Sequence, residues 1–122
     1  MNYSETIRFH GHNGPFLALG FKLGKFLVRE LKPKGIMDFK IMVKTRLEKP
    51  FTCLIDGLQC STFATLGKGN IMVKDSKGKN VIVFVRKGEK KLKIQITKRS
   101  MDICCNARDL NEAANKIFRT PA

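Results

Sequence analysis

Tryptophan is absent from this chain, tyrosine occurs once, and only 10 of the 122 residues are acidic. The small acidic complement disfavours a carboxylate-based hydrolase, and neither paired carboxylates nor a serine–histidine–carboxylate triad can be recognised. No apolar run approaches the roughly 18 residues of a membrane span. The N-terminus lacks a basic segment that leads into an apolar one, so we expect no signal peptide and no membrane partner.

The four cysteines are not arranged in pairs that would bind a structural metal. They contain no Cys-x-x-Cys spacing, and Cys104 and Cys105 are adjacent. Adjacent cysteines suit neither an ordinary disulfide nor a zinc finger. We therefore expect reduced, mostly buried thiols, which agrees with a cytoplasmic location.

Positive charge is in excess, with 24 Lys and Arg against 10 Asp and Glu and a formal net charge of +14. Such a balance attracts nucleic acid, anionic membranes or acidic partners. A lysine-rich surface also serves solubility. The basic residues are spread along the chain without the interleaved aromatic residues of single-strand binders. A basic nucleic-acid-binding module is therefore an alternative function rather than the first one.

Hydrophobic periodicity predicts a succession of helices and strands. Phe16, Leu23 and Leu27 recur at helical spacing, and Pro15 suits the first turn of that helix. Gly20 and Gly24 lie on its apolar side, which indicates close packing against another element or a second copy of the chain. The predicted helices span residues 14–31, 52–64 (with Thr52 as N-cap) and 100–119 (broken near residue 106), and the predicted strands span residues 39–47, 70–75, 81–86 and 91–97.

The order of these elements gives an α+β fold. The last three strands follow one another through short connections, so we expect a meander with 81–86 as the central strand. The prediction is an antiparallel sheet of about four strands, packed with N-terminal, middle and C-terminal helices. At this length the chain is expected to form a single domain, residues 1–122.

Both histidines lie in the segment Phe-His-Gly-His-Asn-Gly-Pro, directly before the first predicted helix. Imidazole is the commonest metal ligand in proteins, and a helix N-terminus suits an anion. Two histidines supply only two ligands, so the others must come from distant parts of the chain. Either histidine can instead serve the backbone, His10 through a hydrogen bond and His12 as an N-cap partner.

Three segments carry a resemblance to a known family. The first segment, residues 9–20, contains the two histidines and ends in Leu-Ala-Leu-Gly. The second contains Cys53, Asp56 and Gln59, spaced three apart. The third, residues 65–70, reads Thr-Leu-Gly-Lys-Gly-Asn. In this order they resemble the FmdE family, which takes its name from formylmethanofuran dehydrogenase and whose patterns are Phe-His-Gly-His-x-Cys-Pro-Gly, Cys-x-x-Asp-x-x-Gln and Gly-Cys-Thr-x-Gly-Lys-Gly-Asn. The resemblance spans roughly residues 7–100 and implies a metal- or redox-competent pocket.

This chain departs from the family pattern at positions that bear on the chemistry. Gly14 and Ala64 stand where the family has cysteines, and Phe16 and Phe63 stand where it has glycines. Longer members add a C-terminal zinc ribbon with paired cysteines, which this sequence does not contain. The inherited pocket is thus either a reshaped site or a structural relic that binds nothing tightly.

If the segments converge, they form one pocket. His12 and Cys53 would then hold a divalent metal such as zinc, with Asp56 or water completing four ligands. The helix start and a neighbouring lysine would stabilise the Cys53 thiolate, and Lys68 would contact an anion. The predicted pocket residues are His10, His12, Asp56, Gln59, Thr65, Lys68 and Asn70, and the predicted metal ligands are His12 and Cys53.

Plain structural roles compete with each of these assignments. Cys53 and Cys60 lie seven apart on one helical face, as buried core thiols do. Asp56 in the first turn of a helix is favourable for its dipole alone. The Gly-Lys-Gly of residues 67–69 lacks the flanking residues of a phosphate-binding loop and needs no ligand as a turn.

The resemblance implies an accessory, ligand-binding or metal-binding protein linked to molybdenum or tungsten formylmethanofuran dehydrogenase and one-carbon metabolism in methanogens. No molybdopterin or iron–sulfur motif is present, so the catalytic component of that enzyme is not expected. The expected partners are a second copy of the chain in a homodimer, a small-molecule or anionic ligand, and the formylmethanofuran dehydrogenase complex. A small metal-dependent enzyme using His12 and Cys53 is a further alternative, because family membership does not fix function.

Overall fold

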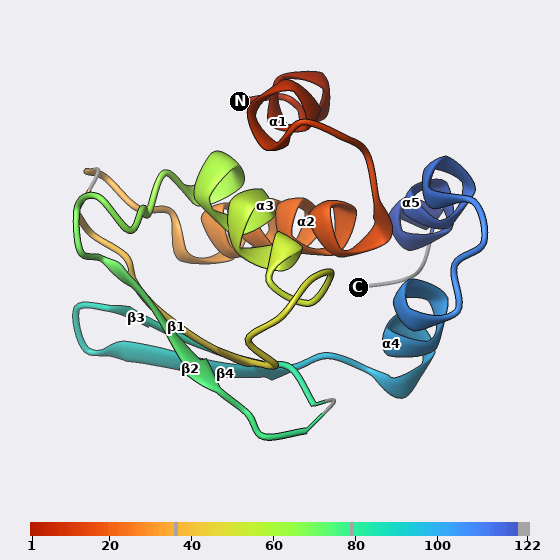
Figure 1. Cartoon of the computed structure of the whole chain (residues 1–122). Coiled ribbons are helices and arrows are strands. Elements are labelled where there is room, and N and C mark those ends of the chain that lie inside the picture. The colour runs from red at the N-terminus through yellow and green to blue at the C-terminus, as the bar shows by residue number, and fades with distance from the viewer. Residues whose placement is uncertain (36, 79, 120–122) are drawn as a thin grey trace.

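The computed structural model describes residues 1–35, 37–78 and 80–119 (Figure 1). Lys79, in the connection before the third predicted strand, and residues 120–122 of the predicted domain lie outside the described residues. The elements are α1 (Tyr3–His10), α2 (Pro15–Leu31), β1 (Lys40–Thr45), α3 (Cys53–Thr62), β2 (Ile71–Asp75), β3 (Ile82–Lys87), β4 (Lys90–Gln95), α4 (Lys98–Cys105) and α5 (Leu110–Arg119). None of the described helices is both long and apolar enough to cross a membrane.

The four strands form one mixed sheet in the order β2-β1-β3-β4. The α+β prediction is confirmed, and β3 is an internal strand as predicted. The prediction of a wholly antiparallel sheet is wrong, because β1 pairs with β2 in parallel. The expected meander is also wrong at β2, which pairs with β1 rather than with β3. Neighbouring parallel strands need a crossover connection, and α3 lies in the connection between β1 and β2.

The helices α2 and α3 lie over one face of the sheet, and α1 lies on their outer side (Figure 1). Alternate residues of the strands point into the core between these layers. The fully buried core side chains include Phe16, Leu17 and Leu27 from α2, Leu54 and Leu58 from α3, and Val43, Ile71 and Val83 from the sheet. No described helix covers the opposite face of the sheet (Figure 1).

Glycines allow α2 and α3 to pack backbone against backbone. A Cβ atom at Gly20 would lie 2.1 Å from the carbonyl oxygen of Leu54, and one at Gly57 would lie 2.3 Å from the carbonyl oxygen of Leu17. The predicted close approach at Gly20 is therefore confirmed, and its partner is a helix of the same chain. This contact fixes α3, which carries Cys53 near its start.

The first helix was not predicted, although its boundaries have clear local causes. Asn2 and Glu5 form a capping box, in which the Asn2 Oδ1 atom accepts from the Glu5 amide at 2.8 Å and the Glu5 Oε1 atom accepts from the Asn2 amide at 2.9 Å. Gly11 ends the helix with a φ of 104°, a left-handed conformation that suits glycine. The chain then turns so that both histidines lie beside α3.

Two predicted helix boundaries have different outcomes. The break near Asn106 is confirmed, and Asp109 Oδ1 accepts from the Glu112 amide at 3.1 Å at the start of α5. Thr52 does precede α3, but its side chain makes no capping hydrogen bond, so the prediction of a side-chain cap there is wrong. Its backbone is already helical, with a φ of −71° and a ψ of −13°, rather than extended as capping residues usually are.

Candidate metal centre

Three potential metal ligands from two distant parts of the chain converge. His10 ends α1, His12 lies in the turn that follows, and Cys53 begins α3. One ligand atom from each of these side chains lies within 4.8 Å of the other two. The structure thus brings together the predicted pair His12 and Cys53, and it adds His10 as a third ligand candidate.

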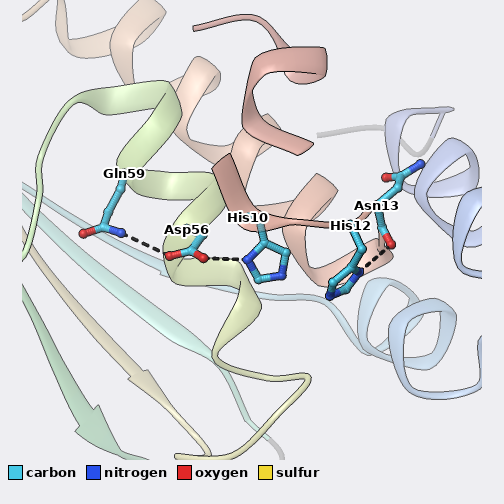
Figure 2. Close-up of polar contacts among 5 residues, drawn as sticks. All are labelled: His10, His12, Asn13, Asp56 and Gln59. Atoms are coloured by element: carbon cyan, nitrogen blue, oxygen red, sulfur yellow. Dashed lines mark hydrogen bonds and ion pairs between the residues drawn. The ribbon is translucent and has the colours of Figure 1, made fainter. Parts of the chain in front are cut away.

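One nitrogen of each imidazole is engaged by a protein oxygen. His10 Nδ1 lies 2.5 Å from Asp56 Oδ2, and His12 Nδ1 lies 2.9 Å from the carbonyl oxygen of Asn13 (Figure 2). A carbonyl or carboxylate oxygen accepts, so each Nδ1 carries a hydrogen, and in a neutral imidazole Nε2 then keeps its lone pair. His10 Nε2 is buried and has no hydrogen-bond partner in the described chain. This is the orientation that a carboxylate gives to a metal-binding histidine.

Asp56 and Gln59 extend this contact away from the histidines. Gln59 Nε2 donates to Asp56 Oδ1 at 3.2 Å, and Gln59 Oε1 accepts from the Leu66 amide at 2.9 Å. Figure 2 shows Gln59, Asp56 and His10 in a row, with Asp56 in the middle. Asp56 is therefore placed to position His10, whereas the prediction made it a candidate fourth ligand.

The remaining predicted pocket residues form a separate hydrogen-bonded loop. The Thr65 amide donates to Asn70 Oδ1 at 2.8 Å, and the Lys68 amide donates to Thr65 Oγ1 at 3.2 Å. The Lys68 ammonium donates to the carbonyl oxygen of Phe63 and to Thr65 Oγ1. The Leu66 amide connects this loop to Gln59, and through Gln59 and Asp56 to His10. A role for Lys68 in anion binding stays a prediction.

Two residues that sequence reasoning missed hold the histidine turn in place. Tyr3 donates its hydroxyl hydrogen to Asn13 Oδ1 at 2.5 Å, and Asn13 Nδ2 donates to Asn111 Oδ1 at 2.9 Å. Burial raises the pKa of Tyr3 to about 12. The turn is thus tied to α1 and to α5. Asn13 could have been noticed because it lies inside the histidine motif, whereas nothing in the sequence marks Tyr3.

The Cys53 thiol is harder to ionise than an ordinary thiol. Burial raises its pKa, the nearby charge of Asp56 raises it further, and Lys49 opposes this shift. The prediction of a stabilised thiolate is therefore wrong for the metal-free protein. A bound cation must displace the thiol proton. The prediction of mostly buried free thiols is confirmed, because only Cys105 of the four is exposed.

The two positions at which the resemblance predicts cysteines, Gly14 and Ala64, lie in different surroundings. A Cβ atom at Gly14 would lie 3.7 Å from His12 Cε1, so a side chain at this position would contact the histidine. Gly14 has an extended backbone that other residues also adopt, with a φ of −178°. Ala64 is buried in the hydrophobic core. Position 14 therefore borders the ligand group of this chain.

Comparison with known proteins places this site in a family. A family model described as "FmdE, Molybdenum formylmethanofuran dehydrogenase operon" matches residues 9–121. The chain belongs to the FmdE family. The match includes both histidines and all of α3, so every member of the candidate metal centre lies within the family domain. The resemblance seen in the sequence is confirmed.

A relative from Archaeoglobus fulgidus is described as a probable S-adenosyl-L-methionine-binding protein. It is 32% identical to this FmdE-family chain over 85 residues, which cover 65% of this chain. The matched segment is 22% of the relative, so this chain spans about a fifth of the curated protein that it matches.

Proposed function

We propose that this FmdE-family protein binds a divalent transition metal, with zinc as the first candidate, through His10, His12 and Cys53. The observation that carries the proposal is the convergence of three ligand atoms within 4.8 Å. Imidazole and thiolate are the ligand types that zinc prefers. The buried and unpartnered His10 Nε2 atom supports the same conclusion, because a buried polar atom without a partner is costly.

Three protein ligands leave the fourth position of a tetrahedral zinc ion open to water or to a small ligand. An open position suits the binding of a small molecule or an anion. The family description names an operon of formylmethanofuran dehydrogenase, which favours an accessory role for this binding. The same open position is also what a small metal-dependent enzyme would use, and this is the second candidate function. The S-adenosyl-L-methionine in the relative's name gives no support for that ligand here, because the match covers only 22% of that protein.

Metal content and cobalt titration test the proposal. Protein purified without a histidine tag should contain close to one metal ion per chain when analysed by elemental mass spectrometry. After removal of that metal, Co²⁺ should produce the near-ultraviolet absorption of a thiolate–cobalt bond. Replacing His10, His12 or Cys53 with alanine should weaken binding, and Cys53→Ala should also abolish the thiolate absorption.

Cys105→Ser is the matched control, because Cys105 is an exposed thiol outside the ligand group. It should leave metal content and the cobalt spectrum unchanged. Gly14→Cys places a thiol against His12 and should tighten cobalt binding. Wild-type affinity in Cys53→Ala, measured by competition with a chelator, would contradict the proposed site.

A further inference from the structure

The face of the sheet that no described helix covers is basic over its whole width. The strand register places the side chains of this open sheet face in rows that run across the sheet. Its residues are Lys40, Met42 and Lys44 of β1, Met72 and Lys74 of β2, Ile82, Phe84 and Arg86 of β3, and Lys91, Lys93 and Gln95 of β4. Six of them are cationic and none is acidic.

The charges of this face are available to a partner. In the part of the chain that the structure describes, none of the six cations is paired with a carboxylate. Lys40, Lys74 and Arg86 are exposed, as are Lys91 and Lys93 of β4. A surface with this many unpaired charges of one sign attracts an anionic polymer and repels a second copy of itself. Charge therefore argues against a homodimer formed through this face.

Apolar side chains occupy the middle of the open sheet face. Met72, Met42 and Phe84 are register neighbours on three adjacent strands, and Lys93 continues the row on the fourth. Met72 is 54% exposed. A shallow hollow of about 400 Å³ lies over this row, between the basic residues of β1 and those of β4. An apolar strip with cations on both sides fits a partner with flat apolar groups on an anionic backbone.

We propose that the open sheet face binds single-stranded nucleic acid. The six cations would contact phosphates. The Lys93 ammonium lies over the Phe84 ring, 5.9 Å from its centroid, and would move from there to a phosphate. Unstacked bases would then stack on the Phe84 ring and on the Arg86 guanidinium plane. A duplex keeps its bases stacked inside and would leave the apolar row unused. The sequence alone does not show that these residues share one surface. Phe84 is separated from most of the basic residues along the chain, and strand pairing brings them together.

A fluorescently labelled oligouridylate of about 12 nucleotides, within the usual range for one small domain, is the probe. Its anisotropy should rise to saturation on addition of the protein. Six phosphate contacts predict that log K falls with log[salt] with a slope of about −4, at about −0.7 per contact for single strands. Lys44→Gln/Lys74→Gln removes two neighbouring cations and should reduce the slope by about 1.4.

Phe84→Leu separates stacking from charge, because it keeps an apolar side chain and removes the ring. It should weaken binding roughly 5- to 150-fold without changing the salt slope, given about 1–3 kcal/mol for one base stacked on an aromatic ring. The charge-matched control is Lys25→Gln/Arg108→Gln, which removes two exposed cations from α2 and from the α4–α5 connection. This control should bind the oligonucleotide with nearly wild-type affinity and slope.

Circular dichroism melting should show that all three variants are folded. Their cobalt spectra should match that of the wild type, so a loss of oligonucleotide binding can be distinguished from a loss of metal binding. No saturable binding at low salt would overturn the proposal. Equal affinity for a duplex, or equal competition by polyglutamate, would also overturn it in favour of nonspecific charge attraction or an acidic protein partner. An unchanged affinity in Phe84→Leu would have the same consequence.

Discussion

The hydrogen bond between His10 and Asp56 determines which nitrogen of that histidine carries the hydrogen and which is left to bind a metal. A neutral imidazole has one protonated and one unprotonated nitrogen, and the carboxylate accepts only from the protonated one. Asp56 is itself held by Gln59, which also bonds the Leu66 amide. The orientation of His10 is therefore fixed by α3 and by the loop that follows it.

Asp56→Asn should weaken metal binding about 10- to 100-fold, as is usual when the carboxylate partner of a metal-binding histidine is lost. The amide retains the shape of the carboxylate but loses its charge, so the imidazole becomes a weaker and less ordered ligand. Competition of Zn²⁺ or Co²⁺ between the protein and a chelator measures the effect. Asp102→Asn, an exposed carboxylate on α4, is the control, and equal affinities in the two variants would show that Asp56 does not position His10.

Sequence reasoning could find some of the candidate ligands and not others, for a physical reason. His12 and Cys53 stand in recognisable motifs, so their residue types indicated metal chemistry. His10 was predicted only as a pocket residue, because its part in the ligand group depends on α1, an eight-residue helix with few apolar residues. The spacing of Asn2 and Glu5 was the available signal for α1. Side-chain contacts such as Tyr3 with Asn13 arise from tertiary packing and leave no local pattern.

At the scale of elements, the contact between α2 and α3 determines where the candidate site forms. Leu17, Gly20 and Phe21 of α2 lie against Gly57 of α3 through backbone atoms. Main-chain atoms cannot move aside as a flexible side chain can. The start of α3, with Cys53 and Asp56, is consequently held at a fixed distance from α2 and from the histidine turn that precedes it.

Gly57→Ala should destabilise the protein by about 3 kcal/mol, at the upper end of the usual range for overpacking. The new Cβ would lie 2.3 Å from the Leu17 carbonyl oxygen and 2.6 Å from the Phe21 nitrogen, so the two helices must separate. Urea unfolding followed by circular dichroism measures the change. Gly67→Ala is the control, because a Cβ there meets no atom within 4 Å, and it should change stability by less than about 0.5 kcal/mol. A similar loss in both variants would contradict this account of the helix contact.

The elements themselves were largely predictable, and their neighbours in the sheet were not. Alternation in β1 indicated which residues face the core, since side chains point to opposite faces of a strand. The same alternation says nothing about which strand pairs with which. Strands β2 and β3 follow each other closely along the chain, which favoured a hairpin, whereas β1 takes the position between them. Pairing of β1 with both strands depends on packing over the whole sheet.

At the scale of the whole molecule, the net charge of +14 opposes folding. Like charges are closer together in the folded chain than in the unfolded one, so their repulsion destabilises the compact state. Part of this repulsion is concentrated on the open sheet face, where Lys44 and Lys74 are register neighbours. The homodimer expected from the sequence stays a prediction. One of its supports was a close contact at Gly20, and this glycine packs against α3 of the same chain. Light scattering would measure the molar mass.

The free energy of unfolding should therefore increase as salt is raised from about 0.01 M to about 0.1 M, where the Debye length falls from about 30 Å to about 10 Å. Screening relieves repulsion among the cations, while exposed ion pairs such as Arg46 with Glu48 contribute little that can be lost. A gain of about 1 kcal/mol would raise the Tm by about 4 °C. Melting in sodium fluoride as well as sodium chloride separates screening from specific anion binding. Lys44→Gln/Lys74→Gln should have a higher Tm than the wild type at low salt, and added salt should raise its Tm by less. A wild-type Tm that falls with salt would show that net repulsion does not limit the stability of this fold.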